Sequence, residues 1–210
     1  MMPIRLVMVD DHPLVLGGLE QLFRGEHDFE VLATCSTAAE GWQAVASHDP
    51  DVLLLDLKLP DTDGLSLLRR LDPAKRPAVV VLTALHDENA LLDAARLGAR
   101  GIVLKAMAPR VLERCVRAVH EGQTWLTVDG VDLAQRLARR QEVETDLARV
   151  LTPRELEIVR LAALQLDNEE IAGRLAISVG TVKIHLHHVF DKLELRGRHA
   201  LQQLLREKGY

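Results

Sequence analysis

The sequence predicts a parallel α/β domain followed by an all-α domain. Five apolar runs alternate with five amphipathic segments as far as residue 121, and from Leu151 onward the apolar residues have only helical periodicity. Continuous Val, Ile and Leu runs are typical of strands buried on both faces, and their alternation with helices predicts a doubly wound sheet with right-handed crossovers. The predicted fold class is α/β, a (βα)5 doubly wound domain, plus a four-helix all-α domain.

Helix signals support the limits of the elements in the first domain. Pro13 and Pro109 suit first-turn positions, where a missing N–H costs nothing. Thr37 followed by Glu40 is a capping-box pattern, and Gly98 suits a helix end. The predicted strands span residues 4–10, 29–34, 51–56, 78–83 and 101–104, and the predicted helices span 13–25, 37–48, 64–72, 87–97 and 109–121.

The second domain begins with a helix-start pattern, Thr152-Pro153-Arg154-Glu155, in which Thr caps the helix and Pro takes its first position. Further helices are predicted over residues 168–175, 179–192 and 198–207. The short turn Ala176-Ile177-Ser178 is typical of a helix-turn-helix, whose second helix enters the DNA major groove.

The expected domain boundaries follow from these patterns. Residues 1–122 form the first domain, residues 123–150 form a linker, and residues 151–210 form the second domain. The linker has an amphipathic pattern over residues 131–143, which predicts a helix, and the pattern is compatible with packing on either domain.

Composition excludes several classes of protein. No apolar stretch approaches the roughly 18 residues that span a bilayer, and no signal segment precedes the first strand. Cys35 and Cys115 lie in apolar patterns, so reduced core thiols and a cytoplasmic location without a membrane partner are expected. The net charge of −5 is uneven: residues 1–125 contain 13 basic and 18 acidic residues, whereas residues 151–210 contain 9 and 8. The second domain is not strongly basic, so a prediction of DNA binding depends on its motif.

Polar residues follow four of the predicted strands. Asp10-Asp11, Asp56, Thr83 and Lys105 stand at strand ends, and the carboxyl ends of parallel strands meet at one edge of the sheet. A carboxylate there can attack phosphorus to form an aspartyl phosphate, while Mg²⁺ offsets the repulsion between the two anions. One or two further carboxylates suffice to hold Mg²⁺. Lys105 would bind one phosphoryl oxygen, and the Thr83 hydroxyl would donate to another.

This pattern resembles the receiver domain of bacterial two-component response regulators, over about residues 3–122. The matching residues are Asp10-Asp11, Asp56-x-x-x-Pro60-x-x-x-Gly64, Thr83-Ala84 and Lys105. The resemblance implies a flavodoxin-like receiver, with Asp56 as the phosphoacceptor and Thr83 and Lys105 as switch residues.

The resemblance also implies further roles. Asp11, Asp56 and the backbone carbonyl of Lys58 would bind Mg²⁺ directly, and Asp10 would bind it through water. Ala84 would leave room for the phosphoryl group. Receivers often have Tyr or Phe three residues before the lysine, but this chain has Ile102, so a rotating aromatic ring cannot be its switch.

The third helix of the second domain has an apolar stripe of Val182, Leu186, Val189 and Leu193. The stretch 151–205 resembles the LuxR-type helix-turn-helix of the NarL/FixJ subfamily. The matching residues are Leu151-Thr152-Pro153-Arg154-Glu155, Glu170-Ile171-Ala172, Ser178, Thr181-Val182-Lys183-x-His185, Lys192-Leu193 and Arg198. By this resemblance Lys183, Ile184 and His187 would face bases, and Thr181, His188 and Arg198 would contact the DNA backbone.

Two positions depart from that subfamily. Gln165 stands where Gly is usual, and Glu169 stands where a basic residue is common. Glu169 lowers the positive charge near the DNA, and Gln165 lowers turn flexibility there. Weak or salt-sensitive DNA binding is therefore one expectation.

The predicted function is a DNA-binding response regulator of a two-component system. A sensor histidine kinase would phosphorylate Asp56, and phosphorylation would control homodimerisation and sequence-specific binding to inverted-repeat half-sites. RNA polymerase is a further candidate partner. The alternative is a phosphorylation-independent DNA-binding regulator, which Ile102 keeps open. The chain is not expected to be an enzyme, because aspartate-nucleophile phosphatases need an acid two positions after the nucleophile, where this chain has Lys58.

Overall fold

The computed structural model describes residues 2–72, 77–84, 88–107, 109–128 and 131–208. The chain divides into two units, Met1–Ala134 and Gln135–Tyr210, and each has its own hydrophobic core. The division lies inside the segment that the sequence predicts as a linker.

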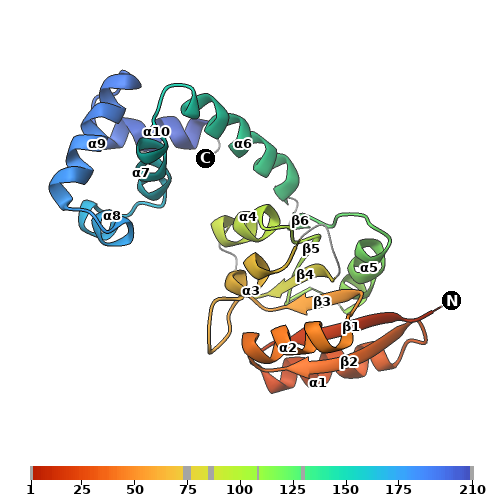
Figure 1. Ribbon diagram of the computed structural model, residues 1–210. Helices are drawn as coiled ribbons and strands as arrows, with labels where there is room; N and C mark the ends of the chain where they lie inside the picture. The colour runs from red at the N-terminus through yellow and green to blue at the C-terminus, as the bar shows by residue number, and fades with distance from the viewer. Residues whose placement is uncertain (1, 73–76, 85–87, 108, 129–130, 209–210) are drawn as a thin grey trace. The chain divides into compact units, whose positions relative to one another are not determined.

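The first unit is built on a parallel sheet with the strand order β2-β1-β3-β4-β5 (Figure 1). The strands are β1 (Ile4–Val9), β2 (Phe29–Cys35), β3 (Val52–Leu55), β4 (Ala78–Thr83) and β5 (Gly101–Leu104). β3 pairs with β1 on one side and β4 on the other, and all four of its side chains are buried. β2 is added on one side of β1, and β3, β4 and β5 are added on the other side. The connections therefore leave β1 and β3 in opposite directions, and a crevice is expected at the carboxyl ends of these two strands.

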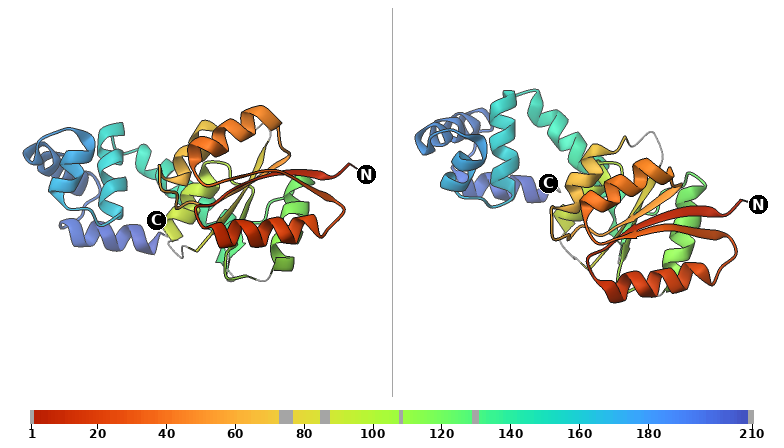
Figure 2. Two further views of the ribbon diagram at one scale, coloured as in Figure 1. Left: turned by 90° about the horizontal axis from the view of Figure 1, so that it is seen from below. Right: turned by 60° about the horizontal axis from the view of Figure 1, so that its bottom comes forward.

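Helices cover both faces of this sheet. They are α1 (Pro13–Arg24), α2 (Ala38–His48), α3 (Gly64–Arg70), α4 (Glu88–Arg96) and α5 (Pro109–His120). Phe23 of α1 and Val116 of α5 share one core cluster with β1, β3 and β4, whereas α2 lies on the opposite face from α1 (Figure 2). Position 87, where the sequence places the start of the fourth helix, lies outside the described residues.

The segment after α5 returns to the edge of the sheet. The Ile102 N–H donates to the Trp125 carbonyl at 2.9 Å, and the Trp125 N–H donates to the Arg100 carbonyl at 2.7 Å. A short antiparallel pair follows, β6 (Thr127–Val128) with β7 (Val131–Asp132), and then α6 (Leu133–Ala148). The helix predicted over residues 131–143 is therefore wrong at its start, because residues 131–132 find ladder partners in β6.

The second unit is helical. Its helices are α7 (Pro153–Ala163), α8 (Asn168–Leu175), α9 (Val179–Lys192) and α10 (Arg198–Glu207). Val143 and Leu147 of α6 are buried in the same core, and the Arg160 guanidinium donates to both carboxylate oxygens of Glu144 at 3.1 and 2.8 Å. The C-terminal half of α6 thus packs on the second unit. Within the described residues, no helix has both the length and the apolar character needed to cross a bilayer.

Candidate functional site

The carboxyl ends of β1, β3, β4 and β5 bring the predicted polar residues together. Asp10 and Asp56 follow β1 and β3, and their side chains are only 3% exposed. The Asp56 N–H donates to the Val9 carbonyl at 2.9 Å, and the Lys105 N–H donates to the Thr83 carbonyl at 2.9 Å. These sheet-like bonds fix the strand ends side by side, so the residues that leave each strand gather at one edge of the sheet, here called the pocket. Thr83, the last residue of β4, is fully buried.

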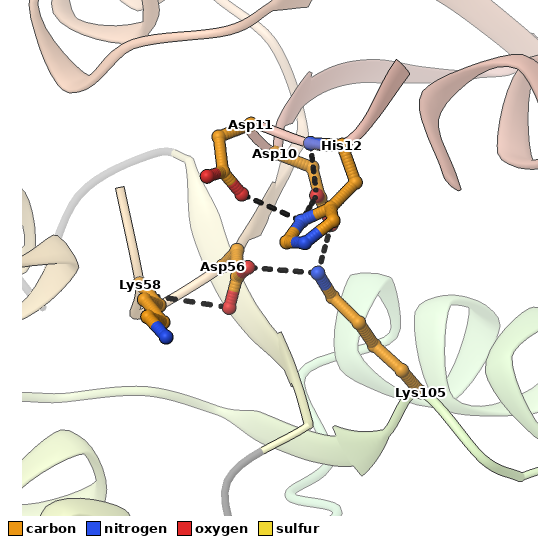
Figure 3. A network of polar contacts seen from close by, with 6 residues as sticks. All are labelled: Asp10, Asp11, His12, Asp56, Lys58 and Lys105. Atoms are coloured by element: carbon orange, nitrogen blue, oxygen red, sulfur yellow. Dashed lines mark hydrogen bonds and ion pairs between the residues drawn. The ribbon is translucent and has the colours of Figure 1, made fainter. Parts of the chain in front are cut away.

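Lys105 is the central cation of this pocket. Its Nζ lies 2.5 Å from Asp10 Oδ2 and 2.7 Å from Asp56 Oδ2 (Figure 3). Burial lowers the pKa of Lys105, but the hydrogen bonds and negative charges of Asp10 and Asp56 outweigh burial and raise this pKa above its ordinary value. The ammonium is therefore charged at neutral pH and stands where it can hold an anionic oxygen.

His12 also lies in this group, although the sequence pattern did not single it out. Its Nδ1 lies 2.6 Å from Asp11 Oδ1 and 3.1 Å from Asp10 Oδ1 (Figure 3). Its backbone N–H donates to Asp10 Oδ1 at 2.9 Å. The sequence signal was its position directly after the acidic pair, but that position alone does not fix the direction in which the ring points.

The donor set of the pocket fits a divalent cation. Asp10, Asp11, His12 and Asp56 each place one donor atom so that all four atoms lie within 4.8 Å of one another. The site contains the carboxylates of Asp10, Asp11 and Asp56 and the ammonium of Lys105, so a bound cation would offset excess negative charge. Carboxylate oxygens are the ligands that Mg²⁺ prefers in proteins.

The loop after Asp56 explains the spacing between this residue and Gly64. A Cβ atom on Gly64 would lie 2.3 Å from the Asp56 carbonyl oxygen and 2.7 Å from Leu57 Cα, so only glycine fits where the loop returns to the strand. The Lys58 N–H donates to Asp56 Oδ1 at 3.2 Å. Asp61 accepts hydrogen bonds from the first backbone N–H groups of α2, which anchors the loop to this helix.

A second candidate site is the exposed face of α9. Val182, Leu186 and Val189 are buried in the core of the second unit. The opposite face exposes the side chains of Lys183, Ile184, His187 and His188. Ile184 is 58% exposed, so this face of α9 presents an apolar side chain between basic and histidine side chains.

Four predicted DNA-contact residues make contacts inside the second unit: His187 and His188 lie 3.4 and 4.0 Å from the carboxylates of Asp191 and Glu155, and Arg198 and Thr181 form hydrogen bonds. The Arg198 guanidinium donates to Asn168 Oδ1 at 2.9 Å and to the Leu166 carbonyl, so it holds the start of α8. Thr181 Oγ1 lies 2.8 Å from Ser178 Oγ at the start of α9. The structure places Arg198 and Thr181 near helix starts, and the DNA contacts of all four residues stay a prediction.

Comparison with protein families matches both units. Residues 6–117 match the response regulator receiver domain, and residues 149–205 match the bacterial regulatory proteins of the luxR family. The chain belongs to the response-regulator family, with a LuxR-type second domain. It is 33% identical over 212 residues to the oxygen regulatory protein NreC of Staphylococcus haemolyticus, covering 98% of each chain. It is 34% identical over 199 residues to the nitrate/nitrite response regulator protein NarL of Escherichia coli, covering 93% of this chain and 92% of NarL.

Solved structures of response regulators have the same fold. RcsB from Salmonella enterica serovar Typhimurium, bound to a promoter in the presence of a phosphomimetic, is 25% identical, has a TM-score of 0.61, and covers 96% of this chain and 97% of its own. The response regulator ChrA of a heme-sensing two-component system is 31% identical, has a TM-score of 0.54, and covers 99% and 98%. The predicted fold class and the predicted NarL/FixJ family are confirmed.

Within this receiver, Ile102 and Ala84 lie in different environments. Ile102 is fully buried in the centre of β5, whereas Ala84 is exposed directly after β4. The side chain of Ile102 is wholly apolar, so moving it from the core into water would be unfavourable.

Proposed function

We propose that this response regulator binds DNA through α9 and that phosphorylation of Asp56 controls the binding. The observation that carries the proposal is the buried Asp56 carboxylate, whose Oδ2 lies 2.7 Å from the Lys105 ammonium inside a pocket of three carboxylates. A sensor histidine kinase is the proposed phosphoryl donor, in keeping with the receiver family.

The transfer is a displacement at phosphorus. An oxygen of Asp56 forms a bond to phosphorus as the bond to the donor imidazole nitrogen breaks, and the nitrogen keeps the electron pair. A bound Mg²⁺ supplies charge neutralisation between carboxylate and phosphoryl group. Asp10, Asp11, Asp56 and the Lys58 carbonyl are the proposed residues that hold it. Lys105 then shifts its contact from the Asp56 carboxylate to a phosphoryl oxygen, and the Thr83 hydroxyl donates to another.

The output surface is the exposed side of α9. Lys183 suits the acceptor edge of guanine, and Ile184 suits the methyl group of thymine. Thr181, His187, His188 and Arg198 complete the proposed contact set. A phosphorylated homodimer would place two copies of α9 on inverted-repeat half-sites in the cytoplasm, where RNA polymerase is a further proposed partner.

The test is DNA binding by the full-length protein with and without beryllofluoride and Mg²⁺, followed by fluorescence anisotropy. The DNA fragments are selected from genomic DNA with residues 135–210. Beryllofluoride should tighten binding by wild type at least tenfold and leave Asp56→Asn unchanged. Asp49→Asn is the matched control, because it removes one carboxylate just before the amino end of β3, away from the pocket, and it should respond like wild type. Lys183→Ala should weaken binding in every state.

A second candidate function is DNA binding that does not depend on phosphorylation. The fully buried Ile102 favours it, because the aromatic side chain that many receivers move during activation is replaced by a core residue. In that case Asp56→Asn binds DNA as wild type does, and beryllofluoride changes neither protein.

A further inference from the structure

The loop that follows Asp56 is held at its tip by a neighbouring helix. Pro60, Asp61 and Thr62 are exposed, so burial in the core does not fix this part of the loop. The two carboxylate oxygens of Asp61 instead accept from the Ala38 and Ala39 N–H groups, each at 3.0 Å. These N–H groups belong to the first turn of α2 and have no acceptor within the helix. One side chain therefore joins the loop tip to a helix start.

The bond between Asp61 and α2 is charged. The Ala38 N–H, together with the Ala39 N–H, holds the pKa of the Asp61 carboxyl below its ordinary value of 3.8, although desolvation acts in the other direction. The carboxylate is thus ionised at neutral pH. The positive end of the helix dipole favours a negative charge at this place, and charge-assisted hydrogen bonds are stronger than neutral ones.

The start of α2 is a firm support for the loop. A Cβ atom on Gly41 would lie 2.6 Å from a side-chain carbon of Val9, so the first turn of α2 lies directly against the end of β1. The next residue after Val9 is Asp10, which enters the pocket. A loop tied to α2 is therefore tied to the same strand end that supplies part of the acidic pocket.

The loop also carries Lys58 next to the phosphoacceptor. The Lys58 N–H donates to Asp56 Oδ1 at 3.2 Å, and Lys58 forms an isolated antiparallel bridge with Asp63. The two arms of the loop thus meet at its base, and Asp61 lies between them at the tip. Pro60, with its fixed φ angle, separates Asp61 from the Lys58 arm. A tip fixed on α2 consequently limits the movement of the Lys58 backbone.

We propose that Asp61 is a positioning residue for the cation site, because its bond to α2 fixes the loop that supplies the Lys58 carbonyl to Mg²⁺. The inference rests on the proposed function in taking Asp56 and the Lys58 carbonyl as ligands of the ion. A free loop would have to be ordered when the ion binds, and the lost conformational entropy would weaken binding. Asp61 orders the loop before the ion arrives.

The experiment measures Mg²⁺ binding to the full-length protein by isothermal titration calorimetry. Salt at about 150 mM screens exposed charges beyond roughly 8 Å. Asp61→Ala removes both bonds to α2, and Asp61→Asn removes the charge but keeps one acceptor oxygen. Thr37→Ala is the matched control, because Thr37 Oγ1 accepts from the Glu40 N–H at 3.2 Å and so caps the same helix without belonging to the loop. Amide hydrogen exchange of residues 57–63 in the metal-free protein is the second measurement.

Asp61→Ala should raise the Mg²⁺ dissociation constant about tenfold, in line with the loss of groups that orient metal ligands. It should also speed amide exchange in the loop. Thr37→Ala should match wild type in both measurements, although it weakens the same helix start. Asp61→Asn should lie between wild type and Asp61→Ala, because one hydrogen bond remains.

The contrary results are equally distinct. Equal Mg²⁺ affinities in wild type and Asp61→Ala, or equal losses in Asp61→Ala and Thr37→Ala, would overturn the positioning role and leave the phosphorylation proposal standing. Weak Mg²⁺ binding in both Asp61 variants with unchanged loop exchange would show that charge alone acts, which also overturns the role. A wild type that binds no Mg²⁺ would overturn this inference and the proposed function together. Mg²⁺ binding that depends on Asp61, in a protein whose DNA binding ignores beryllofluoride, would sustain the inference while the proposed function fails.

Discussion

Each unit of the protein holds a buried carboxylate against a lysine ammonium at the same distance. Asp56 Oδ2 lies 2.7 Å from Lys105 Nζ in the first unit, and Glu155 Oε2 lies 2.7 Å from Lys192 Nζ in the second. Both carboxylates are nearly inaccessible, at 3% and 4% exposure. Their surroundings differ in charge balance.

Glu155 belongs to a balanced structural pair. Its carboxylate also accepts from the Thr152 N–H at 2.8 Å and completes the capping box of α7. In the first unit, Asp10 and Asp56 share the Lys105 ammonium, and Asp11 stands beside them against His12. A buried pair whose charges cancel contributes to stability, whereas a buried group of like charges stores repulsion that a cation or a phosphoryl transfer can relieve. Charge balance, more than the pair itself, separates a structural role from a functional one.

The largest expected effect concerns the extent of the second unit. Residues 151–210 alone lack Val143 and Leu147, which are buried in its core, and Glu144, which pairs with Arg160. Removal of two buried aliphatic side chains should lower the free energy of unfolding by about 4 kcal/mol relative to residues 135–210. Urea unfolding of the two segments, followed by far-UV circular dichroism, measures the difference. Equal stabilities would show that α6 is a tether only.

The next effect tests the charge-balance comparison itself. Glu155→Ala removes both the ion pair and half of the capping box, and should destabilise residues 135–210 by about 2 kcal/mol. Asp56→Asn removes one of three like charges and should raise the free energy of unfolding of the first unit by about 1 kcal/mol.

The fluorescence of Trp42 and Trp125 reports the first unit in the full-length protein, because both tryptophans of the chain lie there. Glu157→Ala, whose carboxylate forms a surface pair with Arg154, is the control for Glu155 and should cost well under 1 kcal/mol. A loss of stability in Asp56→Asn as large as that in Glu155→Ala would contradict the comparison.

A smaller effect is expected from acid. Burial raises the pKa of Glu155, but Lys192 and the Thr152 N–H outweigh burial and lower this pKa to about 2, from an ordinary value of 4.5. The folded form therefore holds the Glu155 proton less tightly than the unfolded form does. The stabilisation is complete above about pH 4.5 and is lost as the pH falls toward 2. Unfolding of residues 135–210 between pH 6 and 2 should show this slope, reduced in Glu155→Gln and retained in Glu157→Gln.

Sequence patterns predicted the backbone more completely than they predicted the pocket. The helices over 168–175, 179–192 and 198–207 match α8, α9 and α10, because caps and apolar periodicity are both local signals. The hairpin of β6 and β7 was not predicted. Asp129-Gly130, a dipeptide favoured in two-residue hairpin turns, was the available signal, and these two residues lie outside the described part of the chain.

Sequence patterns predicted which strand-end residues lie in the pocket but did not predict the directions of their side chains. Strand ends placed Asp10, Asp56 and Lys105 at one edge, because topology alone determines that edge. The direction of the His12 ring and the contacts of Arg198 with the Leu166 carbonyl depend on side-chain rotamers and on partners distant in the sequence. Periodicity contains no information on either.

The smallest effect concerns backbone strain, which is also unequal between the units. In the first unit the non-glycine residue with positive φ, among the described residues, is Asp49, a type that tolerates this region. The second unit has Gln165 at φ 60, Ala176 and Glu194. Gln165 stands where the LuxR-type pattern has glycine, so Gln165→Gly should relieve strain and stabilise residues 135–210 by about 0.5 to 1 kcal/mol, net of the added entropy of the unfolded chain. Asp49→Gly should change the stability of the first unit by less. If Gln165→Gly is destabilising, the side chain of Gln165 contributes more to the α7–α8 turn than its backbone conformation costs, and the strain is part of how this unit holds the start of α8.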